Sequence, residues 1–282
     1  MMKKEIVMEK KEKEINGMQK LGKGMLVILS IAFGIGGSIL VGLLFGKPVK
    51  ALFPNRFVQE FILEALSAVL ALLLIFLFQK KKVLKVSSEG MAEGIYCGMA
   101  WILFPVIAVA GVIFDLANET GLQMISGGEI AMLLLQCVMI GVFEEFVFRG
   151  VAQELAFELF GSETKKQARR AIVLVAFLFG AMHLINALQP EITIQAALMQ
   201  AISVFGVGLV YGAIFYRSGR CIWPCVIFHA LQDASAFVAS GVLFGTTQEQ
   251  AIGNTSLTQA VYALLFVAWF IYLMRDRHEE EA

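Results

Sequence analysis

Long apolar stretches, each close to the length that a helix needs to cross a lipid bilayer, dominate this chain. About 20 mainly apolar residues span a hydrocarbon core of about 30 Å. Eight stretches qualify: 24–46, 57–79, 95–115, 130–151, 170–188, 196–216, 222–243 and 257–274. The sequence therefore predicts an all-α, polytopic transmembrane helical bundle of about eight spans.

Composition supports this class and excludes others. Of the 282 residues, 58% are hydrophobic and 16% are charged, against about 45–50% and about 25% in soluble domains. A water-soluble globular protein and a disordered chain are therefore excluded as leading interpretations. The 23 Lys and Arg residues only balance the 23 Asp and Glu residues, so there is no basic excess to bind nucleic acid. We expect membrane lipids as partners and no nucleic acid.

The distribution of Lys and Arg predicts the topology, because short cytoplasmic loops are enriched in these residues. Nineteen of the 23 fall in segments on one side of the predicted spans: 1–23, 80–85, 165–170, 217–220 and 275–277. The first loop on the other side, with Lys47, Lys50 and Arg56, is an exception. We therefore expect a multi-pass protein of the cell membrane with both termini in the cytoplasm.

One membrane domain accounts for most of the chain. We expect a charged cytoplasmic tail at 1–23, a single membrane-embedded domain at 24–274 with its motif-bearing core at 130–240, and a cytoplasmic tail at 275–282. The small-xxx-small pairs Gly42/Gly46 and Gly208/Gly212 predict close contacts between helices.

Three polar clusters lie inside predicted spans, where ionisable groups are costly and each is a functional hypothesis. The first contains Glu144, Glu145 and Arg149, and the i,i+4 spacing lets Glu145 face Arg149. The second ends in His183. The third holds His229 and Asp233, again at i,i+4, so that Asp233 can orient the imidazole of His229.

A carboxylate and two imidazoles that converge on one point are the groups needed to hydrolyse an amide with activated water. A glutamate can act as general base, and a histidine can stabilise the developing oxyanion. Serine nucleophiles are the alternative, with Ser203, Ser218 and Ser235 as candidates, although none lies in a G-x-S-x-G motif. A site for a divalent metal such as zinc, made of Glu144, His183 and His229, is chemically possible but disfavoured, so we expect no cofactor.

The order and spacing of these clusters resemble the CPBP family of intramembrane glutamic endopeptidases, which includes the type II CAAX prenyl endopeptidases. The resemblance covers roughly 130–240 and consists of Glu144-Glu145-x-x-x-Arg149, Phe179-x-x-x-His183 and His229-x-x-x-Asp233. It implies a membrane endopeptidase whose substrate is a peptide or protein, lipidated or membrane-bound in the best-known cases.

The resemblance also implies roles for individual residues. Glu144 corresponds to the base, His183 to the group that helps to activate water, and His229 with Asp233 to the oxyanion-stabilising pair. An ionised Asp233 cannot donate a hydrogen bond, so its role is either that of a protonated donor or that of orienting His229. Glu145, Arg149 and Phe179 are expected to support the site. From the predicted topology, which places Glu144 in the cytoplasmic half of its span, we expect a water-filled cavity open to the cytoplasm.

Two other classes of function remain open from the sequence. A non-catalytic immunity or scaffold protein would keep the fold without hydrolysis. A proton-coupled transporter would use the Glu and His residues as a relay, although the inverted repeat typical of transporters is missing.

Overall fold

The computed structural model describes residues 2–118, 124–237, 248–253 and 257–275, and every regular element in these ranges is helical. The first half contains α1 (Met2–Leu52), α2 (Arg56–Leu77), η1 (Lys81–Leu84), α3 (Ser88–Gly98), η2 (Met99–Ile102) and α4 (Leu103–Asn118). The second half contains α5 (Gly127–Glu145), η3 (Phe146–Gln153), α6 (Glu154–Phe160), α7 (Lys165–Met182), η4 (His183–Leu188), α8 (Ile194–Arg217), α9 (Trp223–Phe237), α10 (Gln248–Gly253) and α11 (Leu257–Met274).

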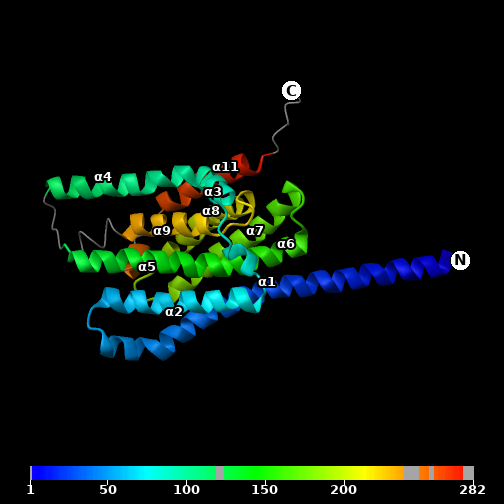
Figure 1. The fold of residues 1–282 in the computed structure, drawn as a ribbon, viewed down its shortest axis with the longest axis horizontal. Helices are drawn as coiled ribbons and strands as arrows, with labels where there is room; N and C mark the ends of the chain where they lie inside the picture. Colours follow the sequence, from blue (N-terminus) through cyan, green and yellow to red (C-terminus); the bar gives the residue numbers. More distant parts are fainter. Residues whose placement is uncertain (1, 119–123, 238–247, 254–256, 276–282) are drawn as a thin grey trace, which may run out of the picture.

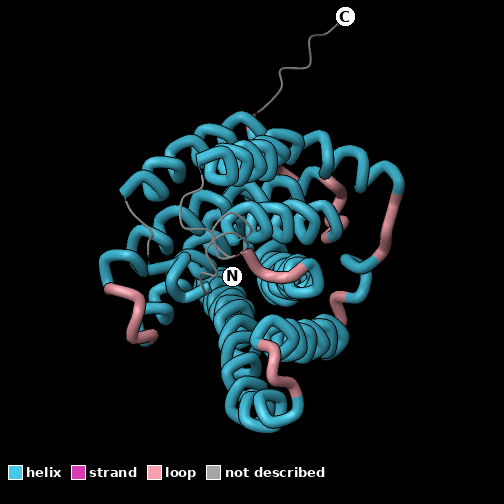
Figure 2. The backbone as a smooth tube through the Cα atoms, turned by 90° about the vertical axis from the view of Figure 1, so that its left-hand side faces the viewer, coloured by secondary structure: helices cyan, strands magenta, loops and turns pink. Residues whose placement is uncertain are grey.

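The long helices form a bundle about one common direction, seen from the side in Figure 1 and end-on in Figure 2. Within the described residues, six helical stretches are long and apolar enough to cross a membrane: Gly17–Leu52, Arg56–Leu77, Ser88–Asn118, Gly127–Phe160, Lys165–Leu188 and Ile194–Arg217. They coincide with the first six predicted spans. The predicted seventh and eighth spans correspond to α9 and α11, which are shorter. The helical membrane bundle is thus confirmed.

Helix α1 is longer than its predicted span. It is continuous from Met2, through the segment expected to be a charged tail, to Leu52. Its first part projects beyond the rest of the bundle (Figure 1).

Polar caps set where several helices begin. The Asn55 side chain accepts hydrogen bonds from the backbone N–H groups of Phe57 and Val58, which would otherwise lack partners in the first turn of α2. Ser126 and Thr164 form capping boxes with Glu129 and Gln167 at the starts of α5 and α7.

The fourth predicted span, 130–151, is too short. Helices α5 and α6 join through η3, a π-helical segment, so that one helical stretch runs from Gly127 to Phe160. A π segment takes more residues per turn than an α-helix and often marks a functional site. It begins directly after Glu144 and Glu145, and all eight of its residues are buried.

The two predicted pairs of small residues have different outcomes. A Cβ atom added to Gly208 would lie 3.1 Å from the Cα atom of Ala176, and one added to Gly212 would lie 2.6 Å from Ile172, so α7 and α8 are in close contact there. The prediction for Gly42 and Gly46 is wrong, because a Cβ atom at either position has no neighbour within 4 Å.

The bundle has two chemically different ends. The five Lys/Arg-rich segments meet at one end, which we call the basic end. There Lys23 donates to the carbonyl of Glu158, and Lys80 pairs with the Glu158 carboxylate. Arg220 pairs with Glu154, and Lys165 donates to the carbonyl of Arg275. The opposite end carries the α1–α2 connection and the start of α5, where Asn55 donates to Glu129 over 2.9 Å.

Candidate active site

A buried charge network joins α5, η3 and α9. Glu145 and Arg149 are both inaccessible to solvent, and Arg149 donates to Glu145 Oε1 over 2.9 Å, as the i,i+4 spacing predicts. The same carboxylate oxygen lies 2.7 Å from His229 Nδ1. Arg149 also donates to the carbonyl of Gly208 over 3.2 Å. Glu145 therefore links the cation of Arg149 to the imidazole of His229.

Glu144 faces a different direction from Glu145, as expected for neighbours about 100° apart on a helix. Its Oε2 atom lies 3.6 Å from His229 Nε2. Asp233 Oδ2 lies 3.6 Å from the same nitrogen. Two carboxylates thus face the free edge of the imidazole, at distances just beyond a direct hydrogen bond.

The structure shows that Asp233 and Glu145 contact different edges of the His229 imidazole. Because Nδ1 of His229 bonds to Glu145 across the helix–helix interface, Glu145 holds the ring. The i,i+4 spacing does bring Asp233 close, but on the Nε2 edge, where it joins Glu144 instead of acting as the buried anchor.

His183 is fixed by its own helix. It stands directly after α7, and its Nδ1 atom lies 2.8 Å from the carbonyl oxygen of Phe179. A carbonyl oxygen only accepts, so Nδ1 carries the hydrogen, and the lone pair is on Nε2. The Phe179 ring packs edge-on against the His183 ring, with 5.1 Å between centroids, and lies under the Arg149 guanidinium at 4.6 Å.

A cavity of about 350 Å³ brings the four predicted catalytic residues together. Glu144, His183, His229 and Asp233 all line it, with Phe179 and Gln200 among the other lining residues. A second cavity of about 190 Å³ is lined by Glu144, His183 and Gln200 as well, and also by Ile35 of α1. The two spaces therefore adjoin at Glu144 and His183. Glu145 and Arg149 lie behind the cavity wall.

Several polar residues around the site were not predicted. The Gln232 side-chain oxygen accepts hydrogen bonds from Trp101 Nε1 and from the Tyr211 hydroxyl, each over 3.0 Å. Asn186 donates to Gln200 over 2.8 Å. These residues lie far apart in the sequence or outside the three clusters, so only the tertiary contacts reveal them. Gln232 is the residue before Asp233 in the sequence, and this position next to a predicted site residue was the one feature that could have indicated its place in the site.

The residues considered for other chemistries lie in different places. Among the residues that the structure describes, no three His, Cys, Asp or Glu side chains are arranged to hold a metal ion. Of the candidate serines, only Ser203 lines the cavity. Ser218 donates to the carbonyls of Phe215 and Cys221, and Ser235 donates to that of Leu231.

Comparison with known proteins identifies the part of the chain that carries this site. Residues 126–235 match the family described as Rce1-like, type II CAAX prenyl endopeptidase Rce1-like. None of the curated proteins compared with the chain matches it. The matched segment runs from the cap of α5 to α9 and contains all seven predicted site residues.

Proposed function

We propose that this chain is an intramembrane endopeptidase that hydrolyses peptide bonds with activated water. The match of residues 126–235 to the Rce1-like family supports this proposal. The observation that carries this proposal is the convergence of Glu144, His183, His229 and Asp233 on one cavity. The family match does not favour a scaffold or a transporter.

Glu144 and His183 activate the water in this proposal. Both residues line both cavities, and in this proposal one water molecule binds between them. Glu144 takes one proton from the water, and the Nε2 lone pair of His183 accepts a hydrogen bond from the O–H group that remains. The water oxygen attacks the scissile carbonyl, and the proton on Glu144 passes to the leaving nitrogen as the C–N bond breaks.

His229 serves the developing oxyanion. Its Nδ1 is held by Glu145, so only Nε2 faces the cavity. In the imidazolium form, Nε2–H donates toward the negative charge that forms on the carbonyl oxygen, where a fixed donor in a site of low dielectric is most effective. Glu145 and Arg149 act as positioning residues, because Glu145 bonds to His229, Arg149 bonds to Glu145, and neither lines the cavity.

The test uses the purified full-length chain in detergent and a pool of water-soluble ten-residue peptides, half of them carrying a prenylated cysteine. Cleavage is followed by mass spectrometry. Glu144→Gln should lower kcat/KM by at least about 100-fold, the usual contribution of a general base. Glu89→Gln is the matched control, because Glu89 is an exposed residue at the start of α3 and should change nothing. Full activity in Glu144→Gln, or no cleavage by the wild-type chain, would contradict the proposal.

A further inference from the structure

Two primary amides lie beside the proposed catalytic residues. Asn186, in η4, donates from Nδ2 to Oε1 of Gln200, in α8, over 2.8 Å. Both residues line the cavity of about 190 Å³ together with Glu144 and His183, and Gln200 also lines the larger cavity. Both side chains belong to half-buried residues. We call Asn186 and Gln200 the amide pair.

The 3₁₀ geometry of η4 places the amide pair on the same side as His183. This element runs from His183 to Leu188. A 3₁₀-helix has three residues per turn, so the side chains at positions 183 and 186 lie one above the other, about 6 Å apart along the axis. An extended peptide advances about 3.3 Å per residue. The amide pair therefore lies about two residues along an extended chain from a carbonyl group held at His183.

The hydrogen bond inside the amide pair leaves one acceptor and one donor unused. A primary amide carries two N–H groups and one carbonyl oxygen. The bond takes one N–H of Asn186 and the oxygen of Gln200, so Asn186 Oδ1 remains as an acceptor and Gln200 Nε2 as a donor. Neither of these two atoms bonds to another group within the described part of the chain.

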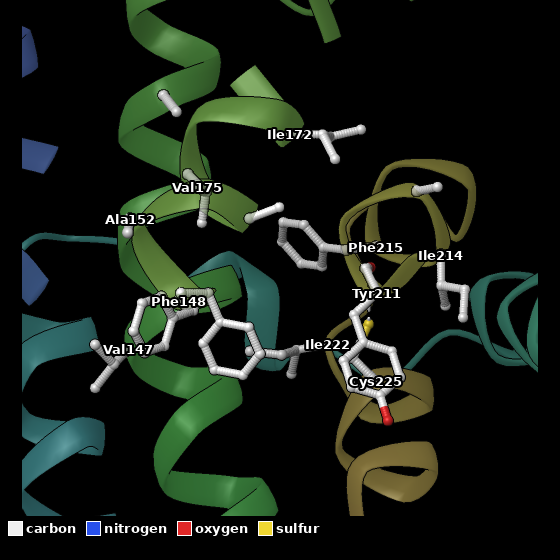
Figure 3. Close-up of a cluster of buried hydrophobic side chains, with 14 of the residues drawn as sticks. Val147, Phe148, Ala152, Ile172, Val175, Tyr211, Ile214, Phe215, Ile222 and Cys225 are labelled. Atoms are coloured by element: carbon white, nitrogen blue, oxygen red, sulfur yellow. Dashed lines mark hydrogen bonds between the residues drawn. The ribbon is translucent and has the colours of Figure 1, made fainter. Parts of the chain in front are cut away.

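The surroundings of the amide pair make these two atoms significant. Apart from Glu144 and His183, the other residues that line the smaller cavity are apolar, Ile35 and Phe148 among them. Figure 3 shows Phe148 on η3 among the buried apolar side chains. Polar groups are costly in such surroundings unless they form hydrogen bonds, so a ligand that pairs with both atoms is favoured over an apolar one.

An extended peptide backbone presents the two complementary groups. In an extended chain, the N–H and C=O groups of one residue point to the same side, which is why paired residues of antiparallel strands exchange two hydrogen bonds. The amide pair offers an acceptor and a donor in the same way. A helical segment does not match it, because its backbone groups are already paired with one another.

We propose that the amide pair binds the peptide backbone of the substrate, at a residue about two positions from the scissile bond. Asn186 Oδ1 accepts from the N–H group of that residue, and Gln200 Nε2 donates to its carbonyl oxygen. This inference rests on the proposed protease function and names the substrate class. The substrate is a segment that is extended at this residue and is selected by its backbone, so proline, which lacks the N–H group, is disfavoured there.

Ester analogues of a cleaved peptide test the acceptor. The ten-residue peptide that the wild-type chain cleaves fastest is remade with one backbone N–H group at a time replaced by oxygen, within three residues of the scissile bond and with the scissile amide intact. One analogue should raise KM about 3- to 10-fold, the usual effect of one hydrogen bond. Its kcat should change little, because the bond is present in both the ground state and the transition state.

Asn186→Leu shows whether Asn186 is the acceptor for that N–H group. The variant lacks Oδ1, so it should raise KM for the parent peptide, and the sensitive ester should then raise KM no further. If the amide pair only ties η4 to α8, the variant would weaken all analogues and keep the ester difference. Gln200→Met should raise KM about 3- to 10-fold, again as for one hydrogen bond. Gln195→Met, at an exposed position of the same helix, is the matched control and should leave KM unchanged.

The outcomes separate this binding site from the proposed function. Cleavage by the wild-type chain with no sensitive ester, or an equal ester difference in Asn186→Leu, would overturn the binding site and leave the protease function intact. If Asn186→Leu fails to fold, an unchanged KM in Gln200→Met would overturn it instead. No cleavage by the wild-type chain would refute the protease function, and the backbone site with it.

Discussion

The buried pair of Glu145 and Arg149 combines a structural role with a positioning role, and paired substitutions separate the two. Both side chains are inaccessible to solvent, and Glu145 also holds His229. Arg149→Met removes the cation and leaves the Glu145 carboxylate with His229 alone. Adding Glu145→Leu removes the remaining charge and also the acceptor for His229. Adding Glu145→Gln removes the charge but retains a carbonyl oxygen for Nδ1.

The expected magnitudes follow from burial. Removing one partner of a buried ion pair costs about 3–5 kcal/mol, whereas replacing both partners by apolar residues is often neutral. At about 1.4 kcal/mol per factor of ten, Arg149→Met should lower the folded-to-unfolded ratio by more than about 100-fold. Both double variants should recover most of this loss. Activity should return only with Glu145→Gln, because only that variant still orients His229.

The chain provides its own assay for unfolding. Its four cysteines are buried, so a thiol-reactive dye becomes fluorescent as the bundle opens during titration with SDS in mixed micelles. Peptide cleavage by the same preparations gives kcat. A cost below about 1 kcal/mol for Arg149→Met would refute the buried-pair argument. Equal activity in the two double variants would refute the positioning role of Glu145.

Two further predictions concern packing and metal. Gly180→Ala should lower stability by about 1–3 kcal/mol in the same thiol assay, because its Cβ atom would lie 2.6 Å from the carbonyl oxygen of Ala201. Gly42→Ala, with no neighbour within 4 Å, is the control and should not destabilise the chain; equal effects would contradict the packing argument. Chelation with EDTA should leave kcat/KM unchanged, and elemental analysis should find no stoichiometric zinc; activity restored by zinc after chelation would refute the metal-free mechanism.

Local spacing predicted the parts of this structure that depend on a single helix. The apolar stretches located the first six spanning helices, and the i,i+4 rule gave the contact between Glu145 and Arg149. The separate directions of Glu144 and Glu145 also follow from helix geometry alone.

Contacts between helices could not be predicted in the same way. Glu145 and His229 are 84 residues apart, and Trp101 and Gln232 are 131 residues apart, so no sequence period connects them. The π-helical segment after Glu145 has no local signature in an apolar stretch. The failure at Gly42 has the same origin, since a small residue allows a close contact but does not supply the neighbouring helix.

The buried pair of Glu145 and Arg149 has an electrical consequence. One charge moved through 100 mV changes in energy by about 2.3 kcal/mol. Because Glu145 and Arg149 lie together inside the bundle as a neutral pair, a movement that carries both side chains along the membrane normal moves no net charge. A change in membrane potential therefore exerts almost no net force on this pair.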